Sequence, residues 1–440
     1  MIVDALPGAA GFVRKQYWRG THRIVPPQDT AARVRRVMAV MGITRIANVT
    51  GLDRIGIPVV MVCRPNSRSL AVSQGKGLDL EAAMASGLME AVELYHAEHI
   101  VQAVKLASYE EMRYTHSVVD VSAVARSTGS RYNPNLPLLW IEGVDLLDGG
   151  GIWIPYEIVH TNYTLPMPTG SGCFLPSSNG LASGNHLLEA ISHGLCEVVE
   201  RDATSLWQRL DDSARANTRI DLNTVSEADC REAIEKFERA GLVVAVWETT
   251  TDVGIPSFFC LVIEPTDDPM RLLHFARGMG CHPARHIALL RALTEAAQSR
   301  LTYISGSRDD LYRAEYGRAR SRELLQVFRE LATGNGPARP FHEGPSFCGE
   351  TIDEDVAWEL DRLRAVAISQ VVVVDLTRAE FRLPVVRVVI PGPHERLRVH
   401  RSHAVGRRGA DGLGRRLSPA GFPGRRLSSL LSASYRYRDH

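Results

Sequence analysis

Residues 187–206 read LLEAISHGLCEVVERDATSL, and their spacing predicts one long helix. Apolar side chains recur three and four residues apart along one side of this stretch, at Leu187, Ile191, Leu195 and Val198. Polar side chains form a second stripe, which runs through Glu189, His193, Glu197 and the Glu200–Arg201 pair. A helix that is otherwise so apolar is expected to be largely buried, so its carboxylates should face a polar cavity.

The pattern around these glutamates occurs three times in the chain. It consists of a small residue, Leu, any residue, Glu, two apolar residues, and then Glu or Gln. The copies are GLMEAVE at 87–93, GLCEVVE at 194–200 and ALTEAAQ at 292–298. They lie about a hundred residues apart, which is too far for a solenoid repeat. We infer that the three segments arose by an old duplication or that they share a structural role.

The recurring carboxylates predict a cation. Stacked carboxylates repel one another and cost stability unless they are protonated or paired with positive charge. A solvated helix face is the simpler interpretation of any single pair, but the pattern recurs on helices with little other charge. Arg201 offsets only part of the negative charge. We therefore favour Mg²⁺, which binds a few carboxylates together with substrate phosphates.

Loops beside these helices have residues suited to phosphate. SQGKG at 73–77 precedes the first helix, SSNGLASGN at 177–185 precedes the second, and SGSRDD at 305–310 follows the third. Their glycines let backbone approach a ligand, and Lys76 and Arg308 add positive charge. A surface turn, an N-cap loop and a helix stop with a surface ion pair are the simpler interpretations. The sequence contains no Walker A loop, nucleophile elbow or zinc-protease motif.

Helical and strand-like segments alternate along the rest of the chain, which predicts a mixed α/β (α+β) fold. Further helices are expected at 30–41, capped by Asp29 or Thr30, at 79–106 and at 286–304. A loop is expected at 164–184. Runs rich in β-branched and aromatic residues predict strands at 55–63, 138–141, 242–247, 258–263, 371–375 and 385–390.

Composition narrows the class of protein. The chain has 440 residues, 45% of them hydrophobic, and a net charge of +1, so nucleic acid is an unlikely partner. The 7 cysteines are scattered without a C-x-x-C motif, which argues against zinc and against a disulfide framework. No signal peptide or bilayer-length apolar run is evident. We expect a cytoplasmic protein without a membrane segment.

These motifs together resemble the YcaO family, over roughly residues 20–391. The resemblance rests on the S-x-G-K-G segment, on Ser86, Glu90 and Glu93, on NGLASGN at 179–185 with the glutamates that follow it, and on Glu295 to Asp310. It implies a specific ATP-binding fold in which helix carboxylates hold Mg²⁺. The stretch GITRIANVTGLDRIGIP at 42–58 resembles the members that work with a TfuA-type partner.

The resemblance also implies roles for individual residues. The Mg²⁺ ligands are expected to be Glu93, Glu189, Glu197 and Glu200. Nucleotide contacts are expected from Ser86, Glu90, Asn185, Gln298 and Lys76, with Arg23 and Thr30 added by a looser alignment. Arg201 and Arg308 are expected to contact phosphate during catalysis.

The activity that the resemblance implies is ATP-dependent phosphorylation of a backbone amide oxygen in a peptide or protein. The TfuA-like features favour a thioamide product, made with a TfuA-type partner or another sulfur donor, and a homodimer is expected. Open alternatives are an azoline-forming cyclodehydratase of ribosomally made peptide biosynthesis and a non-catalytic accessory protein for ribosomal protein methylthiolation. An inactive peptide-binding scaffold and an ATP-dependent ligase or kinase of other chemistry are further alternatives.

The expected organisation has three parts. Residues 1–65 form an N-terminal segment that contributes to the catalytic domain, and residues 66–392 form the YcaO catalytic domain. Residues 393–440 are rich in Arg and lack apolar periodicity, so we expect a disordered or aberrant tail, with a basic nucleic-acid-binding tail as the alternative.

Overall fold

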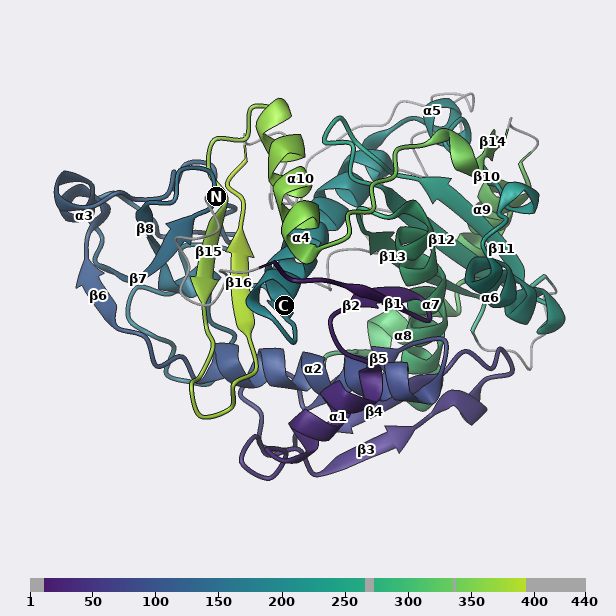
Figure 1. Cartoon of the computed structure of the whole chain (residues 1–440), viewed down its shortest axis with the longest axis horizontal. Helices are drawn as coiled ribbons and strands as arrows, with labels where there is room; N and C mark the ends of the chain where they lie inside the picture. The colour runs from purple at the N-terminus through teal and green to yellow at the C-terminus, as the bar shows by residue number, and fades with distance from the viewer. Residues whose placement is uncertain (1–11, 266–272, 335–337, 393–440) are drawn as a thin grey trace, which may run out of the picture.

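A computed structural model describes residues 12–265, 273–334 and 338–392 of the chain. Helices and strands interleave in it, which confirms the predicted mixed fold (Figure 1). The predicted Arg-rich tail at 393–440 lies outside the described residues.

The largest sheet has six antiparallel strands and forms the left half of Figure 1. Its order is β6-β7-β15-β16-β9, and β8 pairs with β7. The central strand β15 and its partner β16 are valine-rich, and its other partner β7 is largely apolar, as a buried sheet centre requires. The strands are β6 (Val104–Ala107), β7 (Leu138–Asp145), β8 (Gly151–Pro155), β9 (Leu181–Ser183), β15 (Val372–Asp375) and β16 (Val385–Val389).

Two smaller antiparallel sheets share one design. Each has three strands in sequence order and is followed by a long helix. The first unit contains β3 (Arg45–Asn48), β4 (Val59–Cys63), β5 (Val72–Lys76) and helix α2 (Leu80–Glu98). The second contains β11 (Val243–Glu248), β12 (Ser257–Ile263), β13 (Phe275–Cys281) and helix α7 (Arg285–Ser305). A third long helix, α4 (Leu187–Arg209), follows β9 and lies between the large sheet and the β11–β13 sheet (Figure 1).

Glycines let α2 and α7 pack directly on the backbone of the strands beside them. A Cβ at Gly75 of β5 would overlap the Ala83 carbonyl oxygen of α2, and a Cβ at Gly278 of β13 would overlap the Ala292 carbonyl oxygen of α7. The expectation that residues 73–77 form a turn is therefore wrong, because most of this segment is a buried strand. Its glycines serve helix packing.

The remaining elements surround these units. Helix α1 packs on α2 and α10 packs on α4, while Tyr17 of a two-stranded hairpin contacts α6 and α7. The elements are β1 (Gln16–Trp18), β2 (Thr21–Arg23), α1 (Pro27–Arg35), η2 (Thr50–Leu52), α3 (Tyr109–Thr115), η3 (Tyr156–Ile158), α5 (Asp212–Ala216), β10 (Ile220–Asp221), η4 (Leu222–Thr224), α6 (Ala228–Arg239), α8 (Arg313–Ala319), α9 (Arg322–Thr333), β14 (Arg339–Pro340), η5 (Phe341–Glu343) and α10 (Ile352–Ala365).

Some expected element boundaries are wrong. The helix expected at 30–41 is α1, which begins at Pro27 and ends at Arg35, with Pro26 rather than Asp29 or Thr30 at its N-cap. The helix expected at 79–106 ends at Glu98, and β6 follows it. The loop expected at 164–184 contains the short strand β9 near its end.

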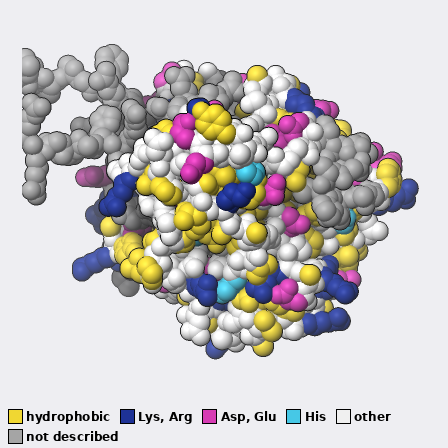
Figure 2. All heavy atoms as spheres, turned by 90° about the vertical axis from the view of Figure 1, so that its left-hand side faces the viewer, with side chains coloured by type: hydrophobic (Ala, Val, Ile, Leu, Met, Phe, Trp, Pro, Cys, Tyr) yellow, Lys and Arg dark blue, Asp and Glu magenta, His cyan; other side chains and the backbone are white. Residues whose placement is uncertain are grey.

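The face that carries the outer edge of the large sheet mixes side-chain types. Figure 2 shows hydrophobic, basic and acidic side chains interspersed there, as the near-neutral net charge predicts. Val104 and Leu106 of β6 are among the exposed large hydrophobic residues. Among the helices of the described ranges, we find none with both the length and the apolar character that crossing a bilayer requires.

Candidate functional site

A cavity of about 490 Å³ opens where α2, α4 and α7 converge. Each helix contributes the polar residues of its recurring pattern, and we call this space the carboxylate cavity. Its carboxylates are Glu90 and Glu93 from α2, Glu197 and Glu200 from α4, and Glu295 from α7. The apolar stripes of the same helices are buried, with Leu88, Leu195 and Leu293 fully inaccessible to solvent.

The structure brings nearly all of the predicted site residues to this cavity. Segments far apart in the sequence provide them: the β2–α1 region, β5, the loop between β9 and α4, the three helices and the loop after α7. The predicted residues that line it are Arg23, Thr30, Lys76, Ser86, Glu90, Glu93, Asn185, Glu197, Glu200, Arg201, Gln298 and Arg308.

Glu189 is the predicted site residue that the structure places elsewhere. It does not line the cavity, and it is only 2% exposed. Its two oxygens accept hydrogen bonds from the backbone N–H groups of Ile24 (2.6 Å) and Asn185 (2.7 Å). Glu189 therefore ties the segment after β2 to the start of α4, and so shapes the cavity wall that carries Asn185.

A polar contact also joins α1 to this wall. The Asn185 side-chain amide donates to the Thr30 hydroxyl at 2.9 Å, and the Arg33 guanidinium donates to the Asn185 carbonyl oxygen at 3.1 Å. Two nucleotide contacts expected from sequence, Thr30 and Asn185, are thus direct neighbours.

Burial shifts the pKa of the cavity carboxyls upward. It raises the pKa of Glu90 to about 7, and it raises the pKa of Glu93 well above its usual range. Burial also raises the pKa of Glu197, against the opposing charge of Arg201. The pKa of Glu200 rises to about 7 because burial is reinforced by repulsion from Glu295. Burial thus favours the neutral form of these carboxyls as long as no cation is bound beside them.

Lys76, Arg201 and Arg308, three basic side chains of the cavity, form ion pairs with acids. Lys76 Nζ lies 2.7 Å from Glu295 Oε2, and Arg201 Nη2 lies 3.8 Å from Glu197 Oε1. Arg308 forms a two-pronged ion pair with Asp310, in which Nε donates to Oδ1 at 2.7 Å. The Lys76 pair joins β5 to α7, the Arg201 pair lies within α4, and the Arg308 pair lies in the loop after α7; at each of them an incoming phosphate would compete for the cation.

Glu295 is the site residue that the sequence-based assignment missed. It occupies the same position in its heptapeptide as Glu90 and Glu197 do in theirs. The signal was therefore available in the repeat itself. Its partner Lys76 had been assigned to a phosphate-binding turn, but Lys76 is the last residue of β5.

The cavity residues fit Mg²⁺ held jointly with a nucleotide. In the described part of the chain, no three His, Cys, Asp or Glu side chains form a ready-made metal cage. The carboxylates instead lie on different walls, which suits a cation that completes its shell with phosphate oxygens and water. Gln74 Nε2 is a buried cavity-wall donor without a hydrogen-bond partner among the described residues, so it is available to a bound ligand.

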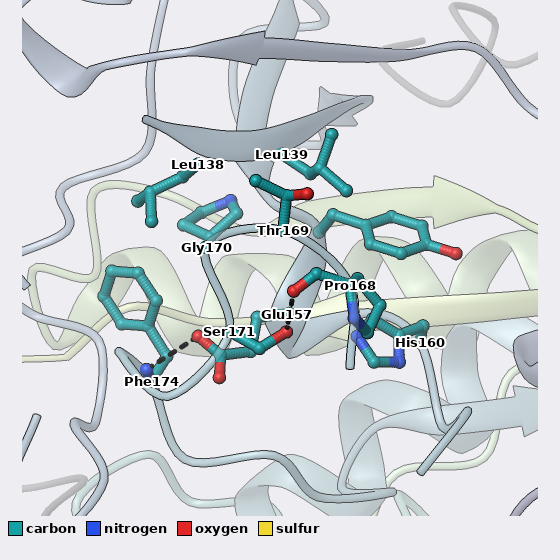
Figure 3. Close-up of a pocket in the computed structure, with 11 residues that line it drawn as sticks. Leu138, Leu139, Glu157, His160, Pro168, Thr169, Gly170, Ser171 and Phe174 are labelled. Atoms are coloured by element: carbon teal, nitrogen blue, oxygen red, sulfur yellow. Dashed lines mark hydrogen bonds between the residues drawn. The ribbon is translucent and has the colours of Figure 1, made fainter. Parts of the chain in front are cut away.

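A second, much smaller hollow lies under the large sheet (Figure 3). Its volume of about 10 Å³ suits one water molecule rather than a substrate. Glu157 lies there beneath the 168–174 loop and accepts hydrogen bonds from the backbone N–H groups of Cys173 and Phe174, as Figure 3 shows in part. This carboxylate holds the loop, and the carboxylate cavity remains the candidate functional site.

Comparison with known proteins gives a family match over most of the chain. The profile of a family described as "YcaO cyclodehydratase, ATP- and Mg²⁺-binding" matches residues 74–394. The matched region spans all three carboxylate helices.

Two relatives are similar over nearly the full chain. An uncharacterized protein in the tfuA 3′ region of Rhizobium leguminosarum bv. trifolii is 40% identical, over 84% of this chain and 88% of the relative. An uncharacterized protein of Methanothermobacter thermautotrophicus is 33% identical, over 84% of this chain and 94% of the relative.

Two solved structures share the fold. A heterocyclase in complex with substrate and cofactor has a TM-score of 0.73 at 22% identity, over 87% of this chain. This chain spans only 54% of that heterocyclase. A YcaO protein from Methanopyrus kandleri, bound with AMPPCP and Mg²⁺, has a TM-score of 0.67 at 22% identity and covers 86% of this chain and 93% of its own.

Proposed function

Because the chain belongs to the YcaO family of ATP- and Mg²⁺-binding proteins, we propose that it activates a backbone amide of a peptide or protein for substitution by sulfur. ATP and Mg²⁺ are its cofactors. In this proposal the amide oxygen is phosphorylated and the product is a thioamide.

The observation that carries the proposal is the convergence of acids and cations in one cavity. Glu93, Glu197 and Glu200 come from two different helices, and Arg201 and Arg308 lie at the same cavity. A divalent cation would stabilise the ionised form of these buried carboxyls, and the cation in turn favours phosphate oxygens. We assign the Mg²⁺ ligands to Glu93, Glu197 and Glu200.

The remaining residues suit binding and shaping of the nucleotide site. Nucleotide contacts are assigned to cavity-lining residues, namely Arg23, Thr30, Lys76, Ser86, Glu90, Asn185 and Gln298. The role of Glu189 as a fourth Mg²⁺ ligand stays a prediction. Both of its carboxylate oxygens accept backbone hydrogen bonds, so Mg²⁺ would have to share or displace these bonds.

Arg201 and Arg308 are assigned to stabilise charge during phosphoryl transfer. When bound, ATP supplies the phosphoryl group and Mg²⁺ offsets the charge of its phosphates. Arg308 would exchange Asp310 for a phosphate oxygen, and Arg201, one helical turn from Glu197, would donate to a second phosphate oxygen. Prepositioned cations of this kind lower the barrier because they meet charge where it develops.

The proposed reaction has two steps. The amide oxygen bonds to the γ-phosphorus, and ADP leaves. A sulfide equivalent then bonds to the amide carbon, and the former amide oxygen leaves as part of phosphate. Phosphorylation is needed because an unmodified amide oxygen is a very poor leaving group. One oxygen atom of the peptide is replaced by one sulfur atom.

A TfuA-type partner is proposed to supply or deliver the sulfur. Two observations support this: the relative in the tfuA 3′ region, and the 42–58 segment that resembles TfuA-associated members. An azoline-forming reaction is the second candidate, favoured by the cyclodehydratase description of the family and by the heterocyclase fold match. In that case a Cys, Ser or Thr side chain of the substrate replaces sulfide as the nucleophile.

Mass spectrometry of the substrate distinguishes these products. The chain would be incubated with a TfuA-type partner, ATP, Mg²⁺, sulfide and precursor peptides encoded beside its gene. A mass gain equal to sulfur minus oxygen, dependent on both ATP and sulfide, is expected. Loss of water without sulfur gain would assign the azoline reaction instead. An unchanged peptide mass across the precursors, while ATP binding is confirmed, would contradict both reactions.

A further inference from the structure

A network of four charged side chains lies just outside the carboxylate cavity. It links the segment after η2, the end of β12 and the last turns of α7. Its members are Asp53, Arg54, Glu264 and Arg300. Asp53 and Arg54 lie in the 42–58 segment, for which the catalytic proposal gives no task.

Arg300 is the centre of the network. Its Nε lies 2.7 Å from Asp53 Oδ2, and its Nη2 lies 3.1 Å from Glu264 Oε1. Arg54 Nη2 lies 2.7 Å from the other oxygen of Glu264, Oε2. The side chains of Asp53, Glu264 and Arg300 are all 5% exposed or less. One guanidinium thus joins two buried acids on separate elements. A lysine would do this less well, because it lacks the planar fork of donors of arginine.

The helix that Arg300 anchors forms one wall of the cavity. Gln298 Nε2 donates to the backbone oxygen of Gln74 at 3.2 Å, and Glu295 pairs with Lys76. On its other side α7 packs on the bare backbone of Gly278 and Gly280 in β13. Leu289 and Leu293 of α7 share a buried apolar cluster with side chains of β12 and α6, and the ion pairs of Arg300 add a polar constraint on the rotation of the helix at its flank.

We propose that Asp53 and Arg54 are positioning residues for the nucleotide cavity, acting through Arg300 and Glu264 on the rotation of α7. The proposal rests on the assignment of the carboxylate cavity to Mg²⁺-nucleotide. It assigns the 50–54 segment the task of holding Glu295 and Gln298 at the cavity, opposite β5.

A purely stabilising role is the alternative. Buried ion pairs contribute little net stability relative to apolar replacements, and their best-attested use is to specify one arrangement. The two roles differ in one measurable way. Loss of a purely stabilising ion pair lowers the melting temperature alone. Loss of a positioning ion pair also changes the nucleotide affinity of the molecules that remain folded.

The test measures AMPPCP affinity in the presence of Mg²⁺ by calorimetry, together with the melting temperature. Asp53→Asn is expected to weaken affinity about tenfold, and Arg54→Gln, at a half-exposed position, about threefold. Asp355→Asn is the matched control, because Asp355 forms a similarly buried ion pair with Lys15 and does not line the cavity. The control is expected to lose stability and to keep wild-type affinity.

Each outcome is decisive. Folded Asp53→Asn and Arg54→Gln proteins that bind AMPPCP as tightly as wild type would overturn the positioning role. Equal weakening of affinity in the Asp355→Asn control would also overturn it, because the effect would then follow from general loss of stability. Failure of the wild-type protein to bind the nucleotide would overturn the assignment of the cavity, and the positioning role with it.

Discussion

Glu200 shows how one carboxyl limits both stability and function. It is 8% exposed, and burial together with the neighbouring Glu295 raises its pKa to about 7. Above that pH the free protein carries a buried charge without a full counter-ion. Binding of a divalent cation relieves this cost, so metal binding and folding are coupled at this position.

Replacing Glu200 by Gln is expected to lower ATP turnover more than ~100-fold, because a metal ligand is lost. At pH 8 the nucleotide-free variant should melt at a higher temperature than wild type, since the buried charge is gone. Turnover is measured with substrate and partner present, and melting by circular dichroism. Glu235→Gln, at an exposed position of α6, is the control and should change neither value. Wild-type turnover in the Glu200 variant would contradict the assignment.

Glu359 offers a pH test away from the cavity. It is fully buried on α10, accepts a hydrogen bond from Ser192 at 2.7 Å, and burial raises its pKa well above the usual range. Its carboxyl is therefore protonated in the folded protein at pH values where it ionises in the unfolded chain. Stability from this group is complete below the unfolded pKa of about 4.3 and declines as pH rises toward the folded pKa.

Glu359→Gln removes this dependence. Relative to wild type, the variant should gain about 1.4 kcal/mol of unfolding free energy for each pH unit above about 4.5, until the folded pKa is reached. Urea unfolding at pH 5, 6, 7 and 8 measures the difference. Parallel stability curves for the two proteins would show that Glu359 is ionised in the folded state.

At the scale of elements, the long helices owe their positions to glycine in the strands beneath them. The α7–β13 contact is the clearest case, because Gly278 and Gly280 both face the helix backbone. The cavity wall that α7 forms therefore depends on residues that make no contact with a ligand. A small side chain added to β13 should move Glu295 and Gln298.

Gly278→Ala is expected to destabilise the protein by about 1–3 kcal/mol and to weaken nucleotide binding, because the new Cβ displaces α7. Gly317→Ala is the matched control on α8, where a Cβ meets no atom within 4 Å. The control should be neutral or stabilise the protein by up to about 1 kcal/mol through helix propensity. Equal stability of the Gly278 variant and wild type would show that α7 is held elsewhere.

For the whole molecule, sequence periodicity predicted the parts that depend on local pattern. The three carboxylate helices appear where the apolar spacing placed them, except that α2 ends at Glu98 rather than at residue 106 and α4 extends to Arg209 rather than to Leu206. β13 was missed because its sequence FARGMGC has two glycines and no alternation of apolar and polar residues. It forms a strand because it pairs with β12, and this pairing is not visible in the local sequence pattern.

The family resemblance predicted the individual residues of the candidate site, but it did not predict how they are arranged in space. Segments from Arg23 to Arg308 meet because α2 packs on β9, α4 packs on β13 and α7 packs on β5, and these elements are far apart in sequence. That geometry separates Glu189, with its backbone partners, from the glutamates that line the cavity. It also adds Glu295, which the heptapeptide repeat had marked without a role.

The most direct test of the central claim is crystallographic. Crystals grown with AMPPCP and Mn²⁺ in place of Mg²⁺ would be measured at a wavelength where manganese scatters anomalously. Anomalous peaks are expected inside the carboxylate cavity, within coordination distance of Glu93, Glu197 or Glu200 and of the nucleotide phosphates. Nucleotide bound outside this cavity, or manganese without contact to any of the three glutamates, would contradict it.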